Sequence, residues 1–138
     1  MRPSLRLAAA LAGTALLAGV ASVVVLERQD QERARATAEQ LTGGRVEDGE
    51  KAIRRFGCGA CHQIRGIDGA DGRVGPSLNG IALRAEIAGR LVNRPDNLVR
   101  WLRHPQEVVP GNGMPDMSIT DLEARDIAAY LYTLRSQL

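Results

Sequence analysis

Aromatic side chains and cysteines are both scarce in this chain of 138 residues. It contains one Trp, two Tyr, one Phe and two Cys, against 15 Gly. A domain with so few large rings and so much glycine has little from which to build a hydrophobic core unaided. The composition therefore predicts that a large apolar group, not encoded in the sequence, supplies part of the core.

Apolar alternation long enough for a β-strand is absent as well, which argues against a sheet-based fold. The apolar residues that are present have helical spacing, and the sequence predicts short helices joined by long loops, an all-α class. Residues 63–80 are glycine-rich and are expected to form an irregular loop. Three helices are expected. The first begins near Val46 and ends at Gly57, and the second runs from Asp96 to Arg103 and is ended by Pro105. The third begins at a capping box formed by Thr120 and Glu123.

Charge is missing from Leu7 to Leu26, a run of 20 residues. As a helix this run would span about 30 Å, the thickness of the hydrocarbon core of a bilayer. We interpret residues 1–26 as a single transmembrane anchor. A cleaved export signal is the alternative, with Gly19 and Ala21 as small residues near a cleavage site. Arg2 and Arg6 precede the run, so both interpretations place the rest of the chain outside the cytoplasmic membrane.

The remaining chain divides into two parts. Residues 27–45 are polar, mixed in charge and rich in helix formers until Thr42-Gly43-Gly44, and they are predicted to form a stalk with a joint at the glycines. Residues 46–138 form the predicted domain.

Basic residues are unevenly distributed within that domain. Lys51 to Arg103 contains ten Lys or Arg against four Asp or Glu, a net charge of +6, whereas His104 to the C-terminus carries −3. The basic residues form no single block and have no set of stacking aromatics, so the pattern does not indicate nucleic-acid binding. It is consistent with a solvated arginine-rich face or with a docking face for an acidic protein.

Both cysteines lie in the sequence FGCGACH at residues 56–62, immediately before His62. A disulfide between Cys58 and Cys61 would close too small a loop to add much stability, and zinc would need further ligands beyond His104. A thiol–disulfide redox pair requires strands that the chain lacks. The pattern C-x-x-C-H is typical of covalent haem attachment, with the cysteines bonded to the porphyrin and His62 on the iron. Haem would also supply the missing apolar bulk.

The second axial position of such an iron needs another ligand. Met114 lies in PGNGMP, where turn residues on both sides favour an irregular backbone that holds one side chain in place. Met117 and His104 are the alternatives, together with an open site. A thioether ligand raises the haem potential, and two protein ligands leave no position for oxygen or peroxide. Met114 as the second ligand therefore predicts electron transfer without a small-molecule substrate. An unfilled coordination position on the iron would instead suit a peroxidase.

From Val46 onward the chain resembles the class I cytochromes c. The matching segments occur in the family's order: GCGACH at 57–62, GPSLNGIALR at 75–84, NLVRWLRHP at 97–105, PGNGMP at 110–115 and ARDIAAYLYTL at 124–134. The resemblance implies the cytochrome c fold around one covalent haem c, preceded here by the N-terminal helix. The segment RAEIAGRLVNRP between the second and third matches departs from the soluble mitochondrial members.

The resemblance also implies roles for single residues. The Pro76 carbonyl would accept a hydrogen bond from the His62 ring, Arg84 would pair with a haem propionate, and Trp101 would line the pocket near the methionine. Gly49 would allow the last helix to cross closely near Tyr130.

Among its members, the chain looks most similar to membrane-tethered bacterial cytochromes of the terminal-oxidase-associated type. This implies an electron carrier, not an enzyme, on the periplasmic or outer face of a bacterial cytoplasmic membrane. It would receive electrons from a quinol–cytochrome c reductase or a dehydrogenase of a respiratory chain and pass them to a terminal oxidase. The alternative is a permanent cytochrome c subunit of a respiratory oxidase or dehydrogenase complex.

Overall fold

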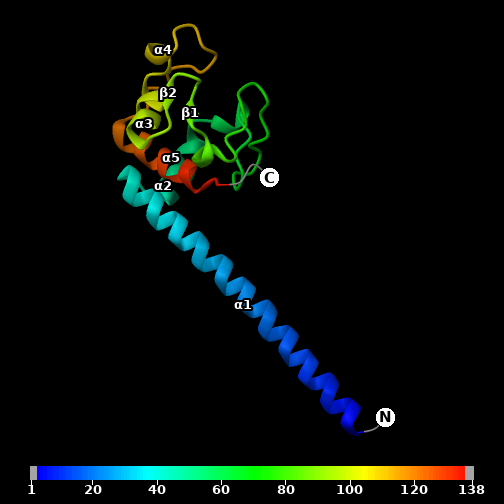
Figure 1. Ribbon diagram of the computed structural model, residues 1–138. Helices are drawn as coiled ribbons and strands as arrows, with labels where there is room; N and C mark the ends of the chain where they lie inside the picture. Colours follow the sequence, from blue (N-terminus) through cyan, green and yellow to red (C-terminus); the bar gives the residue numbers. More distant parts are fainter. Residues whose placement is uncertain (1–2, 136–138) are drawn as a thin grey trace. The chain divides into compact units, whose positions relative to one another are not determined.

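The structure is a computed structural model that describes residues 3–135, with side chains described for Ser4 and for residues 10–135. Its fold is mostly helical, as predicted (Figure 1). Contacts divide the chain into two units, Met1–Arg33 and Ala34–Leu138. The elements in chain order are α1 (Pro3–Thr42), α2 (Val46–Arg55), η1 (Cys58–Ala60), η2 (Ile81–Leu83), β1 (Glu86–Ile87), β2 (Leu91–Val92), α3 (Pro95–Arg103), α4 (Pro105–Val108) and α5 (Asp121–Thr133).

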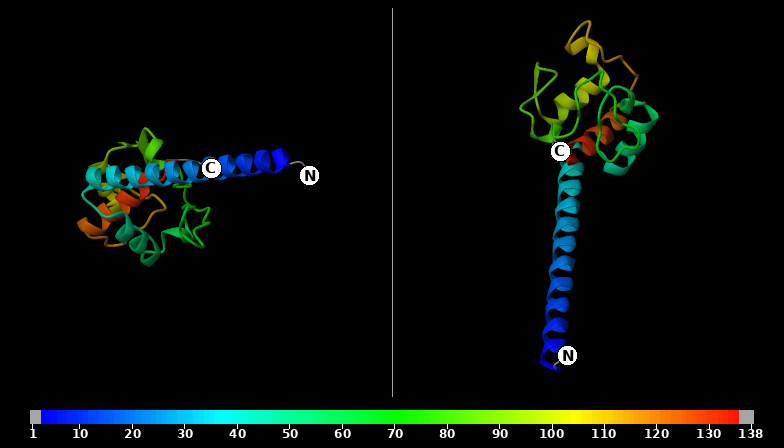
Figure 2. Two further views of the ribbon diagram at one scale, coloured as in Figure 1. Left: turned by 90° about the horizontal axis from the view of Figure 1, so that it is seen from below. Right: turned by 90° about the vertical axis from the view of Figure 1, so that its right-hand side faces the viewer.

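The first unit is the greater part of α1, which is a continuous helix through the predicted anchor and the stalk (Figure 2). Residues 10–33 are all exposed. Among the helices of residues 3–135, the segment Ala10–Thr42 is the one long and apolar enough to cross a membrane. An export signal has similar composition, so the role of this helix is taken up below as a proposal.

The second unit is built on the crossing of α2 and α5, which lie side by side (Figure 1). Gly49 of α2 sits directly against the backbone carbonyl of Asp126, and a Cβ atom there would also lie 3.1 Å from the Cβ of Tyr130. The expectation that Gly49 permits a close crossing near Tyr130 is therefore confirmed. Because the two backbones meet without an intervening side chain, this contact sets the separation of the helices that enclose the core.

Four large side chains at the centre of the second unit are fully buried: Ile53, Leu98, Ile127 and Leu131. They come from α2, α3 and α5, so the core joins α2 to the last helix of the unit. Partly buried residues that pack against this core include Phe56, Trp101, Met114 and Met117. Apolar side chains from distant parts of the chain therefore pack together in one region of the second unit.

The predicted helix ends are present. Thr120 Oγ1 accepts a hydrogen bond from the Glu123 N–H, and a Glu123 carboxylate oxygen accepts one from the Thr120 N–H at 2.9 Å, which completes the capping box of α5. α2 ends at Arg55, and Gly57 follows with φ +67°, the left-handed conformation that glycine adopts most easily. α3 begins at Pro95 and ends at Arg103.

Several short elements were not predicted. Pro105 does not merely end α3: it also begins the four-residue helix α4, because proline is well suited to a first helical turn. The expectation of no strands is wrong for two residue pairs, since Glu86 pairs with Val92 and Ile87 with Leu91 in an antiparallel hairpin. Strands of two residues are too short to produce a recognisable alternation.

Residues 34–45, part of the predicted stalk, pack within the second unit. Ala38 and Thr42 are buried, and the Arg125 guanidinium donates to the Thr42 carbonyl oxygen at 3.1 Å. Beyond the end of α1, Gly44 lies directly against the backbone of Arg125, and the Arg45 N–H donates to the buried Asp126 carboxylate at 2.7 Å. The glycines end α1 as predicted, and Gly44 also permits this close contact with α5.

Candidate functional site

A cavity of about 450 Å³ lies within the second unit and is lined mainly by apolar side chains. Its lining comes from α2, the loops on both sides of η2, α3, the segment after α4, and α5. All seven site residues predicted from the sequence lie on its wall: Cys58, Cys61, His62, Pro76, Arg84, Trp101 and Met114. Residues that are distant in the sequence therefore line the same cavity.

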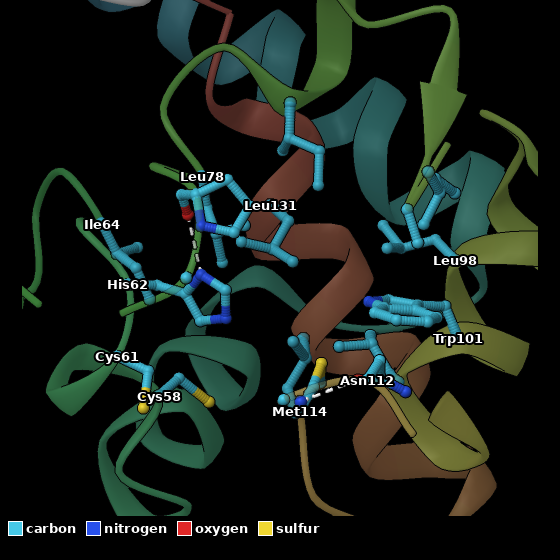
Figure 3. A pocket seen from close by; sticks show the side chains of 18 of the residues that line it. Cys58, Cys61, His62, Ile64, Leu78, Leu98, Trp101, Asn112, Met114 and Leu131 are labelled. Atoms are coloured by element: carbon cyan, nitrogen blue, oxygen red, sulfur yellow. Dashed lines mark hydrogen bonds between the residues drawn. The ribbon is translucent and has the colours of Figure 1, made fainter. Parts of the chain in front are cut away.

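Cys58 and Cys61 lie on one turn at the cavity wall (Figure 3). Gly57 reverses the chain after α2, and the 3₁₀ turn η1 begins at Cys58. The N–H groups of Cys61 and His62 both donate to the Cys58 carbonyl oxygen, at 3.2 and 3.0 Å. This turn places both sulfur atoms at the same edge of the cavity and directs the next residue, His62, inward.

His62 is held by the loop that follows. Its Nδ1 lies 2.7 Å from the Pro76 carbonyl oxygen, so the hydrogen bond that the family resemblance implied is present. Because Nδ1–H donates to this carbonyl, Nε2 is left as the nitrogen with an available lone pair. The ring is thereby fixed in orientation, as a metal-ligating histidine requires.

Gly72 and Gly75, in the stretch predicted only as an irregular loop, shape this arrangement. A Cβ atom on Gly75 would lie 2.7 Å from His62 Nδ1, and one on Gly72 would lie 2.5 Å from the carbonyl carbon of Cys61. The Gly75 N–H also donates to the Cys61 carbonyl oxygen at 2.8 Å. The repeated glycines of residues 66–80 were a visible signal, but only the folded chain shows which of them meet the histidine.

We predict that Gly75→Ala will displace the His62 ring from the Pro76 carbonyl, because the added methyl group cannot share the space of the ring. Overpacking of this kind costs about 1–3 kcal/mol of unfolding free energy. We expect the reduced protein to show a partly high-spin haem spectrum and a lower denaturant midpoint. The exposed neighbour Arg73 provides the control, and Arg73→Ala should change neither measurement. A fully low-spin Gly75→Ala protein of normal stability would contradict the prediction.

Met114 lies across the cavity from His62 (Figure 3). The space between the imidazole and the thioether is where a flat group bonded to both cysteines would lie. Met117 also lines the cavity and therefore stays an alternative ligand. His104 is not among the lining residues, and its Nδ1 lies 3.8 Å from a Glu107 carboxylate oxygen instead.

Trp101 and Arg84 contribute in different ways. Trp101 of α3 is partly buried and packs on the core beside the cavity. Arg84 follows η2, and its guanidinium donates to the backbone carbonyls of Ser77 and Asn79. It thus braces the loop that carries Pro76. A guanidinium has five N–H donors, so these two bonds leave donors for a propionate as well.

The competing interpretations of the cysteines find little support. Within residues 3–135, no group of three or more His, Cys, Asp or Glu side chains could hold a metal ion, which argues against zinc. Burial raises the pKa of the Cys58 thiol. Redox-active cysteines have a lowered pKa, because the thiolate is the reactive form. The donor set and the apolar walls instead fit a porphyrin with covalent links to both sulfurs.

Comparison with known proteins supports the same assignment. The sequence profile of the cytochrome c family matches residues 46–135. A "Cytochrome c2" of Rhodopila globiformis is 37% identical over 56% of this chain and 83% of its own length, and a "Cytochrome c2" of Agrobacterium tumefaciens is 36% identical over 64% and 90%.

A longer relative matches more of the chain. "Cytochrome c oxidase subunit 2" of Alkalihalophilus pseudofirmus is 34% identical over 82% of this chain, which spans only 34% of that protein's length. No solved structure gave a significant match. The chain belongs to the cytochrome c family, and it binds haem c covalently.

Proposed function

We propose that this chain is a mono-haem electron carrier with haem bonded to Cys58 and Cys61 and with His62 and Met114 as the axial ligands. The observation that carries the proposal is the meeting of these four residues around one apolar cavity. Haem iron with two protein ligands changes by one electron between its ferrous and ferric states. With both positions filled, no substrate binds to the iron, so the chain acts as a carrier and not as an enzyme.

The chain's own residues favour rapid electron transfer by holding the site rigid. The Pro76 carbonyl fixes the His62 ring, and Gly75 lets the loop approach it. Trp101 and the apolar core line the cavity, and a fixed surrounding with few polar groups reduces the reorganisation that a change of charge demands. Arg84 braces the loop of Pro76 and has donors left for a propionate.

We further propose a three-part organisation, with residues 1–26 as a membrane anchor, 27–45 as a stalk and 46–138 as the haem domain. The apolar helix and the preceding arginines support an anchor with the haem domain on the outer face of a bacterial cytoplasmic membrane. The second half of the stalk packs on α5. A respiratory donor, such as a quinol–cytochrome c reductase or a dehydrogenase, would supply electrons for a terminal oxidase.

Intact-mass measurement of the mature protein tests the attachment and the anchor together. We expect the mass of one haem added to a chain that retains residues 1–26. A mass without haem, from protein made in cells that mature other c-type cytochromes, would overturn the proposed site. A haem-bearing chain that begins after residue 21 would instead identify a cleaved signal.

Basic residues near the cysteines are the proposed docking charges: Arg54, Arg55 and Arg65. In the structure Arg54 pairs with Glu50 at 3.0 Å and Arg55 pairs with Glu123, which reduces the net charge that these two present. The excess of ten basic over four acidic residues in 51–103 still favours an acidic partner. Complementary charge acts mainly on the rate of encounter.

We therefore predict that electron delivery to an acidic oxidase domain slows by about tenfold or more between low salt and 0.5 M salt. Arg65→Glu should slow delivery at low salt and approach the rate of the unchanged protein at high salt. Stopped-flow measurement of haem oxidation gives both rates. A rate that does not depend on ionic strength would exclude this docking face.

A permanent subunit of a respiratory complex is the second candidate. It is favoured by the match to a protein named as an oxidase subunit, which extends over 82% of this chain. Extraction in a mild detergent distinguishes the two functions. A small haem particle that contains this chain alone supports a carrier, whereas co-purification with oxidase activity supports a subunit.

A further inference from the structure

Two amide side chains surround the backbone of Met114 in the segment that links α4 to α5. Gln106 of α4 donates from Nε2 to the carbonyl oxygens of Asn112 and Met114, at 3.0 and 2.8 Å. Its Oε1 accepts from the Gly111 N–H at 3.1 Å. One exposed side chain thus joins three points of the segment.

Asn112 makes the complementary set of bonds from within the loop. Its Nδ2 donates to the Pro105 and Val109 carbonyl oxygens at 2.8 and 2.7 Å. Its Oδ1 accepts from the Met114 N–H at 2.7 Å, a bond that Figure 3 shows at the cavity wall. Asn112 therefore connects the start of α4 to the methionine.

Together the two amides hold the Met114 backbone on both sides. Asn112 accepts a hydrogen bond from its N–H, and Gln106 donates one to its carbonyl oxygen. The backbone here has little order of its own: Gly111 has φ +78°, Gly113 has no side chain, and no regular element lies between Val108 and Asp121. Side-chain hydrogen bonds are consequently the main restraint on the position of the Met114 backbone.

We propose that Gln106 and Asn112 are positioning residues that hold the Met114 thioether at the iron against exchange. The inference rests on the proposed role of Met114 as the axial ligand. A thioether is a weak ligand, and its retention depends on how rigidly the chain presents it. Only an amide fits both positions, since each side chain must donate and accept at once and a carboxylate can only accept.

Carboxylate variants of nearly the same shape test this requirement in the full-length holoprotein. Gln106→Glu keeps an acceptor for Gly111 but loses both donors. Asn112→Asp keeps the acceptor for Met114 but loses the bonds to Pro105 and Val109. Glu107→Gln is the matched control, because it makes a comparable exchange at the adjacent exposed position, where the side chain lies near His104.

The measurement is the rate at which imidazole replaces the thioether on ferric iron, followed by loss of the sulfur-to-iron charge-transfer band. Loss of two hydrogen bonds predicts replacement roughly tenfold faster in Gln106→Glu, and Glu107→Gln should not change the rate. Unfolding free energy is measured on the same samples. Gln106 is exposed, so its variant is expected to fold even if Asn112→Asp does not mature.

Each outcome decides between specific alternatives. A normal imidazole rate in Gln106→Glu overturns the proposal, and lower stability with a normal rate shows that the bonds serve the fold alone. If Met114→Ala retains the charge-transfer band, the proposed ligand is wrong and the positioning role is excluded with it. If Met114→Ala loses the band but Gln106→Glu shows the imidazole replacement rate of the unchanged protein, Met114 is supported as the ligand. The positioning role of Gln106 then fails.

Discussion

Met114→Ala should abolish the sulfur-to-iron charge-transfer band of the oxidised protein and lower its reduction potential. Alanine offers no donor atom, so the iron would lose the proposed thioether ligand, which stabilises the ferrous state. Axial ligands control haem potentials over about 0.8 V, and we expect a fall on the order of 0.2 V. Potentiometric titration measures this change. The reduced variant should also bind carbon monoxide, whereas we expect the unchanged protein not to bind it.

Met117→Ala is the matched control, because Met117 lines the same cavity three residues further along the chain. Its band and potential should remain close to normal. The opposite pair of results, a normal Met114→Ala and a colour change in Met117→Ala, would reassign the ligand to Met117. A band that survives both substitutions would show that neither methionine binds the iron.

The cysteines and the histidine could be located from the sequence because their chemistry is local. C-x-x-C-H places three functional groups on one turn, and the bonds that close this turn, from the Cys61 and His62 N–H groups to the Cys58 carbonyl oxygen, are local. The capping box of α5 is local for the same reason, since Thr120 and Glu123 are bonded to each other. Features of this kind depend on spacing, which the sequence displays directly.

Close approaches between distant segments could not be located in this way. Gly72 and Gly75 look like their neighbours Gly66 and Gly69, yet only Gly72 and Gly75 press on the turn that bears the cysteines and histidine. Which glycine meets which backbone is decided by tertiary packing. The family resemblance supplied what spacing did not, namely the partner of His62 and the close crossing at Gly49.

The role of Arg84 illustrates a further limit. The resemblance implied that Arg84 would pair with a propionate, but it gave no sign of the two bonds by which Arg84 also braces its own loop, to the carbonyl oxygens of Ser77 and Asn79. Similarly, the polar composition of residues 27–45 predicted a stalk, whereas residues 34–45 pack within the second unit, in part through the bond from the Arg45 N–H to the buried carboxylate of Asp126, 81 residues away in the sequence. A single buried acid carries no sequence signal that names its partner.

Gly49→Ala should destabilise the protein, although alanine is the better residue in an isolated helix. The exchange would favour α2 by about 1 kcal/mol if the site were open. Instead the new methyl group would overlap the Asp126 carbonyl and lie 3.1 Å from the Cβ of Tyr130, so α2 and α5 must separate. Separation would loosen the packing of Ile53 and weaken the bond from Arg45 to Asp126. Overpacking costs about 1–3 kcal/mol, and a clash with backbone lies at the upper end of that range, so after subtracting the gain in helix propensity we expect a net loss of roughly 2 kcal/mol.

Guanidinium unfolding of the oxidised full-length protein in detergent, followed by helical circular dichroism, measures this loss. Lys51→Ala is the control on the same helix, because Lys51 is exposed and pairs with Glu47 and Asp48 at the surface. Exposed pairs contribute about 1 kcal/mol or less, so Lys51→Ala should have the smaller effect. The sign of the change in Gly49→Ala is decisive. A gain in stability would mean that the helix propensity of alanine outweighs the clash with the Asp126 carbonyl. The backbone contact at Gly49 would then not set the separation of α2 and α5.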